Sequence, residues 1–378
     1  MVLIAPTAFK GTLDAGAAAR ALAQGVKAAW PAASCHLLPL SDGGDGFLSV
    51  LVRGRRGRIS WVESEDALGG PHLAPLGWLE EGRVAVAELA RVVGLASLRA
   101  PGPHSAATSG TDGLGRLLAA ALAGGPDQLL VGLGGSASTD GGAGLARPLG
   151  YRLLDREGEE LPRGGAALRR LERIVRPRAA PWARVEVVGA CDVAAPLLGS
   201  RGSARSFGPQ KGADPATVAA LEEGLGRLAE VVARDLGVRA AAVPGAGAAG
   251  GAGFGLLAFA QARLISGSRL VAERVGLDGW LARSQLVVTG EGRVDRQSLA
   301  GKAVGEVVRR ARGAGIPCLV VAGSAEPIAA REVRQLGAVL HLAGDPGGAP
   351  ARRLHEAARL ACQALSAGDP APGPSVHR

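Results

Sequence analysis

Short runs of apolar residues recur along the chain, and each run ends at a polar loop rich in glycine. Runs that are apolar on both faces are typical of strands in a buried, mostly parallel sheet. The sequence predicts such strands at residues 2–6, 36–40, 128–131, 185–191, 285–289 and 318–322.

Helical patterns lie between several of these runs. Ala18, Leu22, Val26 and Trp30 recur every four residues, which predicts a helix that begins near Thr12 or Asp14. Residues 304–312 show a similar pattern that ends at Gly313. Strands that alternate with helices indicate an α/β architecture with right-handed crossovers.

The segment from residue 60 to residue 86 departs from this rhythm. Apolar and polar residues alternate there around turn signals at residues 68–71 and 81–82, which predicts hairpins and the start of a second, mixed domain. We expect this domain to end near residue 260. The Pro- and Gly-rich residues 366–378 are predicted to form a disordered tail.

Length and composition agree with a folded protein of two domains. The chain has 378 residues, of which 59 are Gly, an excess that belongs in loops because Gly weakens helices and strands. The net charge is +9, yet Lys occurs only at positions 10, 27, 211 and 302. An ammonium that persists in so arginine-rich a chain is a candidate for a specific role.

Cysteine usage and the N-terminus point to the cytoplasm. The four cysteines form no CxxC pair and are predicted to be free thiols, and the start of the chain lacks the basic region of a signal peptide. Residues 240–262 are uncharged but contain Pro244 and several glycines, so we expect a loop and a buried helix there instead of a membrane span.

Open α/β sheets bind ligands beyond the carboxyl ends of their strands, so the loops at those ends carry the candidate chemistry. Lys10 follows the first strand beside a predicted helix N-terminus, where an ammonium and free N–H groups favour anions. Asp42 and Asp45 follow the second strand on a Gly-rich turn and are candidates for Mg²⁺, with an ordinary Asp-Gly turn as the alternative.

Three later loops complete this set. Residues 132–142 after the third strand combine glycines with hydroxyls, which suits the binding of phosphate oxygens. Asp192 ends the fourth strand ahead of a basic loop with Lys211, an arrangement that suits either a general base beside an anion clamp or a helix cap. After the fifth strand two acids and two bases follow within a few residues: Glu291, Arg293, Asp295 and Lys302.

Other chemistries find little support. HxxxH and HExxH patterns are absent, which argues against zinc, and no GxSxG nucleophile elbow occurs. Residues 245–250 match GxGxxG, so an NAD-dependent oxidoreductase is retained as an alternative of a different class. A nucleic-acid binder drawn by the positive charge ranks last. Carboxylates, loop lysines and glycine-rich loops together favour Mg²⁺-dependent phosphoryl transfer.

Seven motifs, in this order, resemble the type 1 glycerate kinase family. They are APTAFKGT (residues 5–12), DGGDGF (42–47), GGSASTDGG (134–142), ACDVAAPL (190–197), FGPQKGA (207–213), PGAGAAGG (244–251) and TGEGRVDRQSLAGK (289–302). The resemblance implies two α/β domains with the site in the cleft between them. On this interpretation residues 1–60 and 261–365 form a flavodoxin-like parallel sheet domain, interrupted by an inserted mixed α/β domain at residues 61–260.

The resemblance also implies transfer of the γ-phosphoryl group of ATP to D-glycerate with Mg²⁺, giving 2-phosphoglycerate. The enzyme would be a cytoplasmic phosphotransferase with an alcohol group as acceptor. Formation of 3-phosphoglycerate, or phosphorylation of another small hydroxy acid, is the alternative. We expect no nucleic-acid or membrane partner, and the oligomeric state stays open, with a homodimer as one possibility.

Roles for the individual residues follow as a hypothesis. Lys10, Lys211 and Lys302 would neutralise phosphate and carboxylate charge, and Arg293 would clamp the glycerate carboxylate. Asp192 or Asp295 would accept the proton of the attacking hydroxyl, and Asp42, Asp45 or Glu291 would bind Mg²⁺. Anionic oxygens would be held by Gly134, Gly135, Ser136, Ser138, Thr139, Asp140 and Gly290.

Departures from the family pattern include three in the candidate loops. Thr7 replaces an Asp, Thr139 replaces an Asn, and Asp45 replaces a Glu. A metal or substrate role for position 7 therefore stays open.

Overall fold

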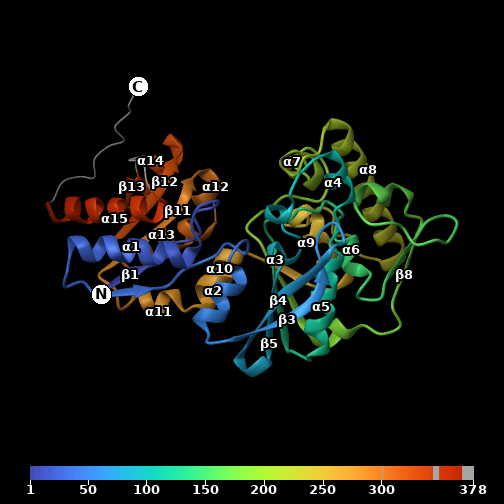
Figure 1. The fold of residues 1–378 in the computed structure, drawn as a ribbon, viewed down its shortest axis with the longest axis horizontal. Helices are drawn as coiled ribbons and strands as arrows, with labels where there is room; N and C mark the ends of the chain where they lie inside the picture. Colours follow the sequence, from blue (N-terminus) through green and yellow to red (C-terminus); the bar gives the residue numbers. More distant parts are fainter. Residues whose placement is uncertain (300, 344–348, 368–378) are drawn as a thin grey trace. The chain divides into compact units, whose positions relative to one another are not determined.

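The computed structural model describes residues 1–299, 301–343 and 349–367, and the contacts divide the chain into two compact units (Figure 1). The terminal unit comprises Met1–Asp42, Ser49–Gly54 and the chain from Ser268 onward. The inserted unit comprises Gly43–Leu48 and Arg55–Gly267. The two long boundaries lie close to residues 60 and 260, but the short Gly43–Leu48 segment groups with the inserted unit.

The terminal unit is built on a five-stranded parallel sheet with the order β13-β12-β11-β1-β2. Central strand positions are buried on both faces, which is the pattern of a sheet covered by helices on either side. The strands are β1 (Val2–Ile4), β2 (Cys35–Leu37), β11 (Leu286–Val294), β12 (Cys318–Ala325) and β13 (Ala338–Leu342).

Helices α1 and α15 lie side by side over one face of this sheet (Figure 1). Asp14 starts α1 by accepting the N–H of Ala17 at 2.7 Å, and small alanines allow the close approach of α15. The helices of this unit are α1 (Ala15–Ala29), α10 (Gly267–Arg274), α11 (Leu277–Leu281), α12 (Arg296–Leu299), α13 (Ala303–Gly313), α14 (Pro327–Gln335) and α15 (Pro350–Ala367), with most of α2 (Phe47–Gly54).

The inserted unit contains a six-stranded mixed sheet with the order β10-β9-β6-β5-β4-β3. Strands β3, β4 and β5 pair antiparallel, as the alternating pattern at residues 60–86 predicts, and β5, β6, β9 and β10 are parallel. The strands are β3 (Arg58–Glu65), β4 (Pro71–Leu79), β5 (Val84–Glu88), β6 (Gln128–Gly132), β9 (Glu186–Ala190) and β10 (Arg263–Ile265), with a separate pair β7 (Arg152–Leu154) and β8 (Arg173–Val175).

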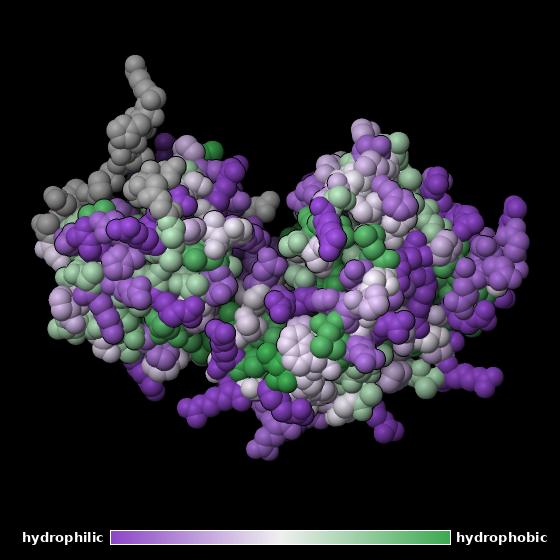
Figure 2. Space-filling view, in the orientation of Figure 1, coloured by the Kyte–Doolittle hydropathy of each residue, from purple (hydrophilic) through white to green (hydrophobic). Residues whose placement is uncertain are grey.

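A cluster of buried apolar side chains joins one face of this sheet to helices of the unit. The α-helices are α3 (Ala90–Val93), α4 (Pro103–Thr108), α5 (Asp112–Ala123), α6 (Ala143–Ala146), α7 (Ser203–Phe207), α8 (Pro215–Leu236) and α9 (Ala248–Phe259). Short 3-10 helices lie at Glu80–Gly82, Leu95–Ser97, Gly165–Arg170, Pro181–Arg184 and Pro209–Lys211. Figure 2 shows hydrophilic side chains spread over the visible face of each unit, with smaller hydrophobic areas among these side chains.

The predicted α/β fold class is confirmed, because all six predicted strands occur and pair in parallel. The uncharged stretch at residues 240–262 forms a loop and the buried helix α9, and among the described residues no helix is long and apolar enough to span a membrane. Ser366, placed in the predicted tail, lies in α15 and accepts the Trp30 indole N–H. Residues 368–378 of that tail lie outside the described residues.

Candidate active site

The parallel strands of the inserted unit bring their carboxyl ends to one edge of the sheet. Glu88 at the end of β5 is in register with Gly132 of β6, and Gly132 is in register with Ala190 of β9. The loops that follow β6 and β9 therefore start at the same level, where ligands of open α/β sheets bind. These are the loops that contain residues 134–142 and Asp192.

The glycine-rich loop packs backbone to backbone against the Gly43–Leu48 segment. A Cβ added to Gly134 would lie 2.5 Å from the Cα of Gly44, and one added to Gly43 would lie 2.5 Å from the carbonyl oxygen of Ala190. Neither position can carry a side chain without a shift of backbone. A Cβ on Gly135 would lie 3.0 Å from Oδ1 of Asp45, so the exposed Asp45 carboxylate lies beside this loop.

Asp140 holds the far end of the loop from within the protein. Its carboxylate accepts hydrogen bonds from the N–H and hydroxyl of Thr111, both at 2.8 Å, and from the N–H groups of Gly142 at 3.1 Å and Gly144 at 3.0 Å. Only 1% of Asp140 is exposed, and this burial raises its pKa, while the hydrogen bonds from Thr111 and Gly144 lower it. Asp140 therefore fixes the backbone of the loop and is itself covered.

Lys211 lies beneath the same loop. Its ammonium donates to the carbonyl oxygen of Ser138 at 2.5 Å and to the hydroxyl of Thr139 at 3.4 Å. Only 3% of the residue is exposed, and burial lowers the pKa of Lys211 to about 7 although the charge of Asp140 raises it. Gly250 completes the contact, since a Cβ there would lie 1.8 Å from the Ser138 carbonyl oxygen.

Two hydroxyls and one further carboxylate lie near these loops. The hydroxyls of Ser136 and Ser138 are buried and lie 2.8 Å apart. Asp192 follows β9 and accepts the hydroxyl of Ser266 at 2.8 Å, which holds one carboxylate oxygen at the end of β10. The half-buried Asp192 is thus oriented, as a proton acceptor needs to be.

In the terminal unit, strand β11 runs five residues farther than the predicted end at Thr289, to Val294. Gly290, Glu291, Arg293 and Val294 are in register with residues of β12, so the charged segment expected as a loop is an extension of the strand. Close packing explains the glycine here, because a Cβ on Gly290 would lie 2.1 Å from the Val321 carbonyl oxygen.

Glu291 carries an unsatisfied carboxylate oxygen. Among the described residues, its Oε1 is buried and has no hydrogen-bond partner. Burial raises the pKa of Glu291 to about 7, the charges of Asp295 and Asp42 raise it further, and Ser298 and Lys302 act in the opposite direction. Two further carboxylates and one ammonium thus lie close enough to act on the carboxyl group of Glu291 at the end of β11.

The other predicted charged residues near Glu291 differ in their contacts and in their exposure. Asp295 accepts the N–H and hydroxyl of Ser298 at 2.8 and 3.1 Å and so caps the short helix α12. Lys302 is half-buried and immediately precedes α13. Lys10 is exposed, and its backbone nitrogen lies 3.6 Å from a Cβ added to Gly292, so the first loop lies against the end of β11.

Two further predicted residues of this unit lie outside that group of carboxylates. Arg293 is largely exposed and donates to Oε1 of Glu326 at 2.9 Å. Thr7 donates its N–H to the Gly290 carbonyl at 2.9 Å, so the residue at this position supports the strand end through its backbone.

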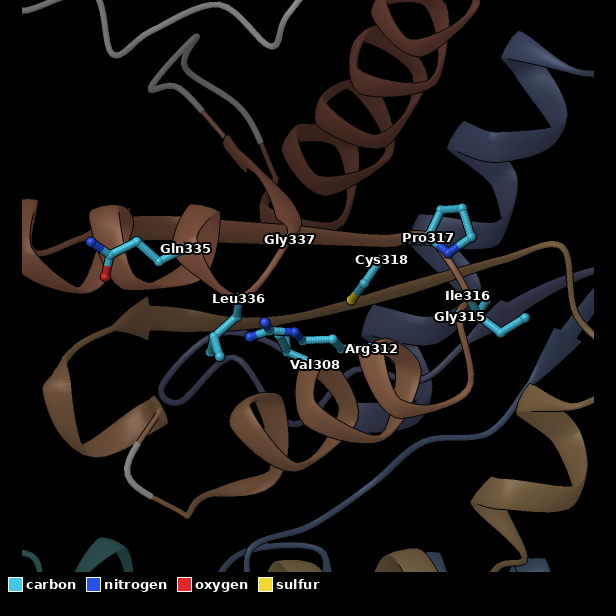
Figure 3. Close-up of a pocket in the computed structure, with 9 residues that line it drawn as sticks. All are labelled: Val308, Arg312, Gly315, Ile316, Pro317, Cys318, Gln335, Leu336 and Gly337. Carbon is cyan, nitrogen blue, oxygen red and sulfur yellow. The ribbon is translucent and has the colours of Figure 1, made fainter.

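The GxGxxG match and a pocket in the terminal unit both lie in settings that do not suit a ligand site of an α/β sheet. Residues 245–250 follow helix α8 instead of a strand, so they lack the strand-to-helix setting of a dinucleotide-binding loop. A pocket of about 290 Å³, lined by Arg312, Cys318 and their neighbours, lies at the amino end of β12 (Figure 3). Ligands of parallel sheets bind at the opposite ends of the strands.

Sequence reasoning missed two residues of the inserted unit, Glu88 and Thr111. Thr111 ties Asp140 to the start of α5, and Glu88 accepts N–H groups of the Gly43–Leu48 segment. Glu88 could have been found from its pattern, because it is an acid at the end of the otherwise apolar run Val84–Glu88. The pattern of residues around Thr111 gives no such signal.

Comparisons with known proteins agree on one family. The model of the glycerate kinase family matches residues 2–364. The glycerate kinase of Halalkalibacterium halodurans is 40% identical over 324 residues, 85% of either chain, and the glycerate 2-kinase of Escherichia coli is 37% identical over 326 residues, again 85% of either chain. A solved structure of a glycerate kinase 2 candidate from Salmonella typhimurium LT2 covers 97% of this chain and 98% of its own, with 34% identity and a TM-score of 0.78.

Proposed function

We infer the function of this chain from its family, because the chain belongs to the glycerate kinase family. We propose that it transfers the γ-phosphoryl group of ATP to D-glycerate. The observation that carries this proposal is the match of residues 2–364 to one family model. The site supports it, because phosphoryl transfer depends mainly on positioning and charge neutralisation, and the strand ends present glycine-rich loops, carboxylates and lysines.

Mg²⁺ fits the donor groups of the terminal unit. The buried Oε1 of Glu291 lacks a hydrogen-bond partner among the described residues, and Asp42 and Asp295 act on the same carboxyl group through their charges. Among the described residues no cluster of three or more His, Cys, Asp or Glu is arranged to hold a metal alone. That suits Mg²⁺, which commonly uses one or two carboxylates together with substrate phosphates. When bound, Mg²⁺ would neutralise phosphate charge.

We assign the phosphate-binding role in the inserted unit to the loop of residues 134–142. Asp140 and Lys211 hold this loop from the protein side, which leaves its remaining N–H groups and Ser136 and Ser138 as candidate donors to anionic oxygens. Lys10 and Lys302 of the terminal unit would neutralise further negative charge, and Gly290 would contact anionic oxygens. Asp45, which lies beside Gly135, is a further candidate ligand for Mg²⁺.

The proton of the attacking hydroxyl goes to Asp192 or Asp295 in this proposal, and Arg293 holds the glycerate carboxylate. Asp192 is supported by the orienting bond from Ser266, whereas Asp295 already accepts two hydrogen bonds from Ser298. The 2-hydroxyl is the proposed acceptor because a relative of this chain is named a glycerate 2-kinase. A cytoplasmic location and the oligomeric state stay predictions.

The test is a coupled assay of the purified chain with ATP, Mg²⁺ and D-glycerate. Enolase added directly detects 2-phosphoglycerate, whereas 3-phosphoglycerate gives a signal only after a mutase is added. Asp192→Asn and Asp295→Asn are compared in the same assay, and the variant that removes the base should lose about 100-fold or more in kcat. Wild-type turnover in both variants would contradict the assignment of the base, and no transfer to glycerate would contradict the function.

A further inference from the structure

Glu88 is a buried carboxylate that no role proposed above explains. It ends strand β5, only 2% of it is exposed, and none of the ion pairs found among the described residues involves it. Burial raises its pKa, as does the charge of Asp45. An acid in such a position is costly unless its oxygens accept well-placed hydrogen bonds.

Those hydrogen bonds come from the Gly43–Leu48 segment. Oε1 of Glu88 accepts the N–H of Gly46 at 3.1 Å, and Oε2 accepts the N–H of Leu48 at 2.9 Å. Leu48 lies in the first turn of α2, whose amides would otherwise need a capping side chain from their own segment. One carboxylate therefore fixes the backbone immediately after Asp45 to the end of a strand.

The fixed segment is also the one that lies against the phosphate-loop candidate. Gly44 packs on Gly134, and Asp45 lies beside Gly135. A side chain displaced by about 1 Å from its productive position can cost an enzyme about 100-fold in rate. A change at Glu88 would therefore reach the site through the position of Asp45.

We propose that Glu88 is a positioning residue, which holds Asp45 against the glycine-rich loop by clamping the amides of Gly46 and Leu48. The inference rests on the proposed function for its catalytic readout. Glu88 would touch neither substrate nor reacting atoms and would act through the side chain of Asp45.

The test is a double-mutant cycle of Glu88→Gln, Asp45→Asn and the two combined. Glutamine keeps the size of the side chain but turns an NH₂ donor toward one of the two N–H groups. We measure kcat/KM for ATP and for glycerate, and independently the Kd of Mg·ATP by calorimetry. Glu63→Gln is the matched control, because Glu63 is an exposed residue of β3 in the same unit.

We expect Glu88→Gln to lower kcat/KM for ATP by about 10- to 100-fold, with KM for glycerate unchanged within about twofold. The combined variant should be no worse than Asp45→Asn alone, because the effect of Glu88 passes through Asp45. A general structural role would instead lower the active fraction in either background, so the losses would multiply. Multiplying losses, or an unchanged Glu88→Gln enzyme, would overturn the proposal.

If Glu88→Gln does not fold, Glu88→Asp takes its place in the cycle, since it keeps the charge but is too short to reach both amides. A wild-type chain that binds Mg·ATP but transfers nothing to glycerate would contradict the proposed function alone. The double-mutant cycle would then be evaluated from the Kd of Mg·ATP, which would still decide the role of Glu88. A wild-type chain that binds no Mg·ATP would overturn both.

Discussion

The two units place their charged residues in opposite ways. In the inserted unit, Asp140 and Lys211 are almost fully covered, and the hydrogen bonds of Asp140 are complete within the protein. In the terminal unit, Glu291 is only half-buried, yet one of its oxygens lacks a hydrogen bond among the described residues, and its neighbours include two further carboxylates. The first set of charges builds the loop through hydrogen bonds, and the second set leaves one buried carboxylate oxygen without one among the described residues.

This difference separates scaffold from ligand-facing chemistry. Buried polar groups that are fully satisfied make a loop rigid, and a preorganised loop does not need to rearrange when charge develops on a bound phosphate. Carboxyl groups that repel one another gain stability when a cation binds, so they are kept at some cost to the folded protein. Substitution of Asp140 and substitution of Glu291 should therefore change stability in opposite directions.

The largest expected effect is the loss of stability in Asp140→Ala. The substitution leaves buried donors of Thr111, Gly142 and Gly144 without an acceptor, and each unsatisfied group costs about 1–3 kcal/mol. We expect the free energy of unfolding to fall by about 3 kcal/mol or more, measured by urea denaturation followed by circular dichroism. Asp127→Ala is the control, because Asp127 pairs with Arg83 on the surface, where such pairs contribute at most about 1 kcal/mol.

Equal losses in these two variants would remove the distinction between the units, because Asp140 would then behave as a surface carboxylate. The ligand-binding role of the loop is checked in the same samples. A destabilised Asp140→Ala protein should bind Mg·ATP more weakly at temperatures where circular dichroism still shows it folded.

The second prediction is a gain in stability on substitution of Glu291, opposite in sign to the loss expected for Asp140→Ala. Its pKa is raised to about 7, so the folded state binds an extra proton relative to the unfolded state between about pH 4.5 and 7. Stability from this group is present below pH 4.5 and is lost as the pH rises to 7. Glu291→Gln should therefore raise the free energy of unfolding at pH 8 by roughly 2 kcal/mol, with little change at pH 4.

Denaturation curves at pH 4, 6 and 8 check this dependence. Catalysis, in contrast to stability, should be impaired in the variant. If Glu291 binds Mg²⁺, the Mg²⁺ concentration for half-maximal activation should be at least about tenfold higher in the variant than in the wild type. The variant would then be more stable but less active, as is common for substitutions at functional sites. A variant that is less stable than the wild type at pH 8 would show that Glu291 is already satisfied in the free protein.

Much of the fold follows from local patterns in the sequence. Residues 128–131 and 318–322 are short apolar runs between glycine-rich loops, and a run of this kind is typical of a buried parallel strand. The alternation at residues 60–86 likewise separates the antiparallel hairpins from the parallel strands. These signals are visible because each depends only on neighbours in the chain.

The site is harder to predict because its contacts are distant in sequence. The pairing that carries β11 on to Val294 depends on β12, more than twenty residues later. Lys211 appears in the sequence as one more loop cation, and only its contact with Ser138, 73 positions away, shows that it lies under the loop. Glu88 caps amides some forty positions earlier in the chain. Local spacing predicts none of these three contacts.

The smallest expected effect on stability, and the last test of the contrast, concerns Arg293. Its partner Glu326 lies 2.9 Å away, but the side chains of Arg293 and Glu326 are 67% and 37% exposed, and pairs of this kind contribute about 0–1 kcal/mol. Arg293→Ala should therefore lower the free energy of unfolding by no more than about 1 kcal/mol.

If Arg293 clamps the glycerate carboxylate, KM for glycerate should nevertheless rise about tenfold or more in Arg293→Ala, because the bidentate hydrogen bonds of the guanidinium are lost. Glu326→Ala shares the loss of the pair but keeps the guanidinium, so it should leave KM for glycerate near the wild-type value. A similar KM for glycerate in the two variants would assign Arg293 to the surface pair alone.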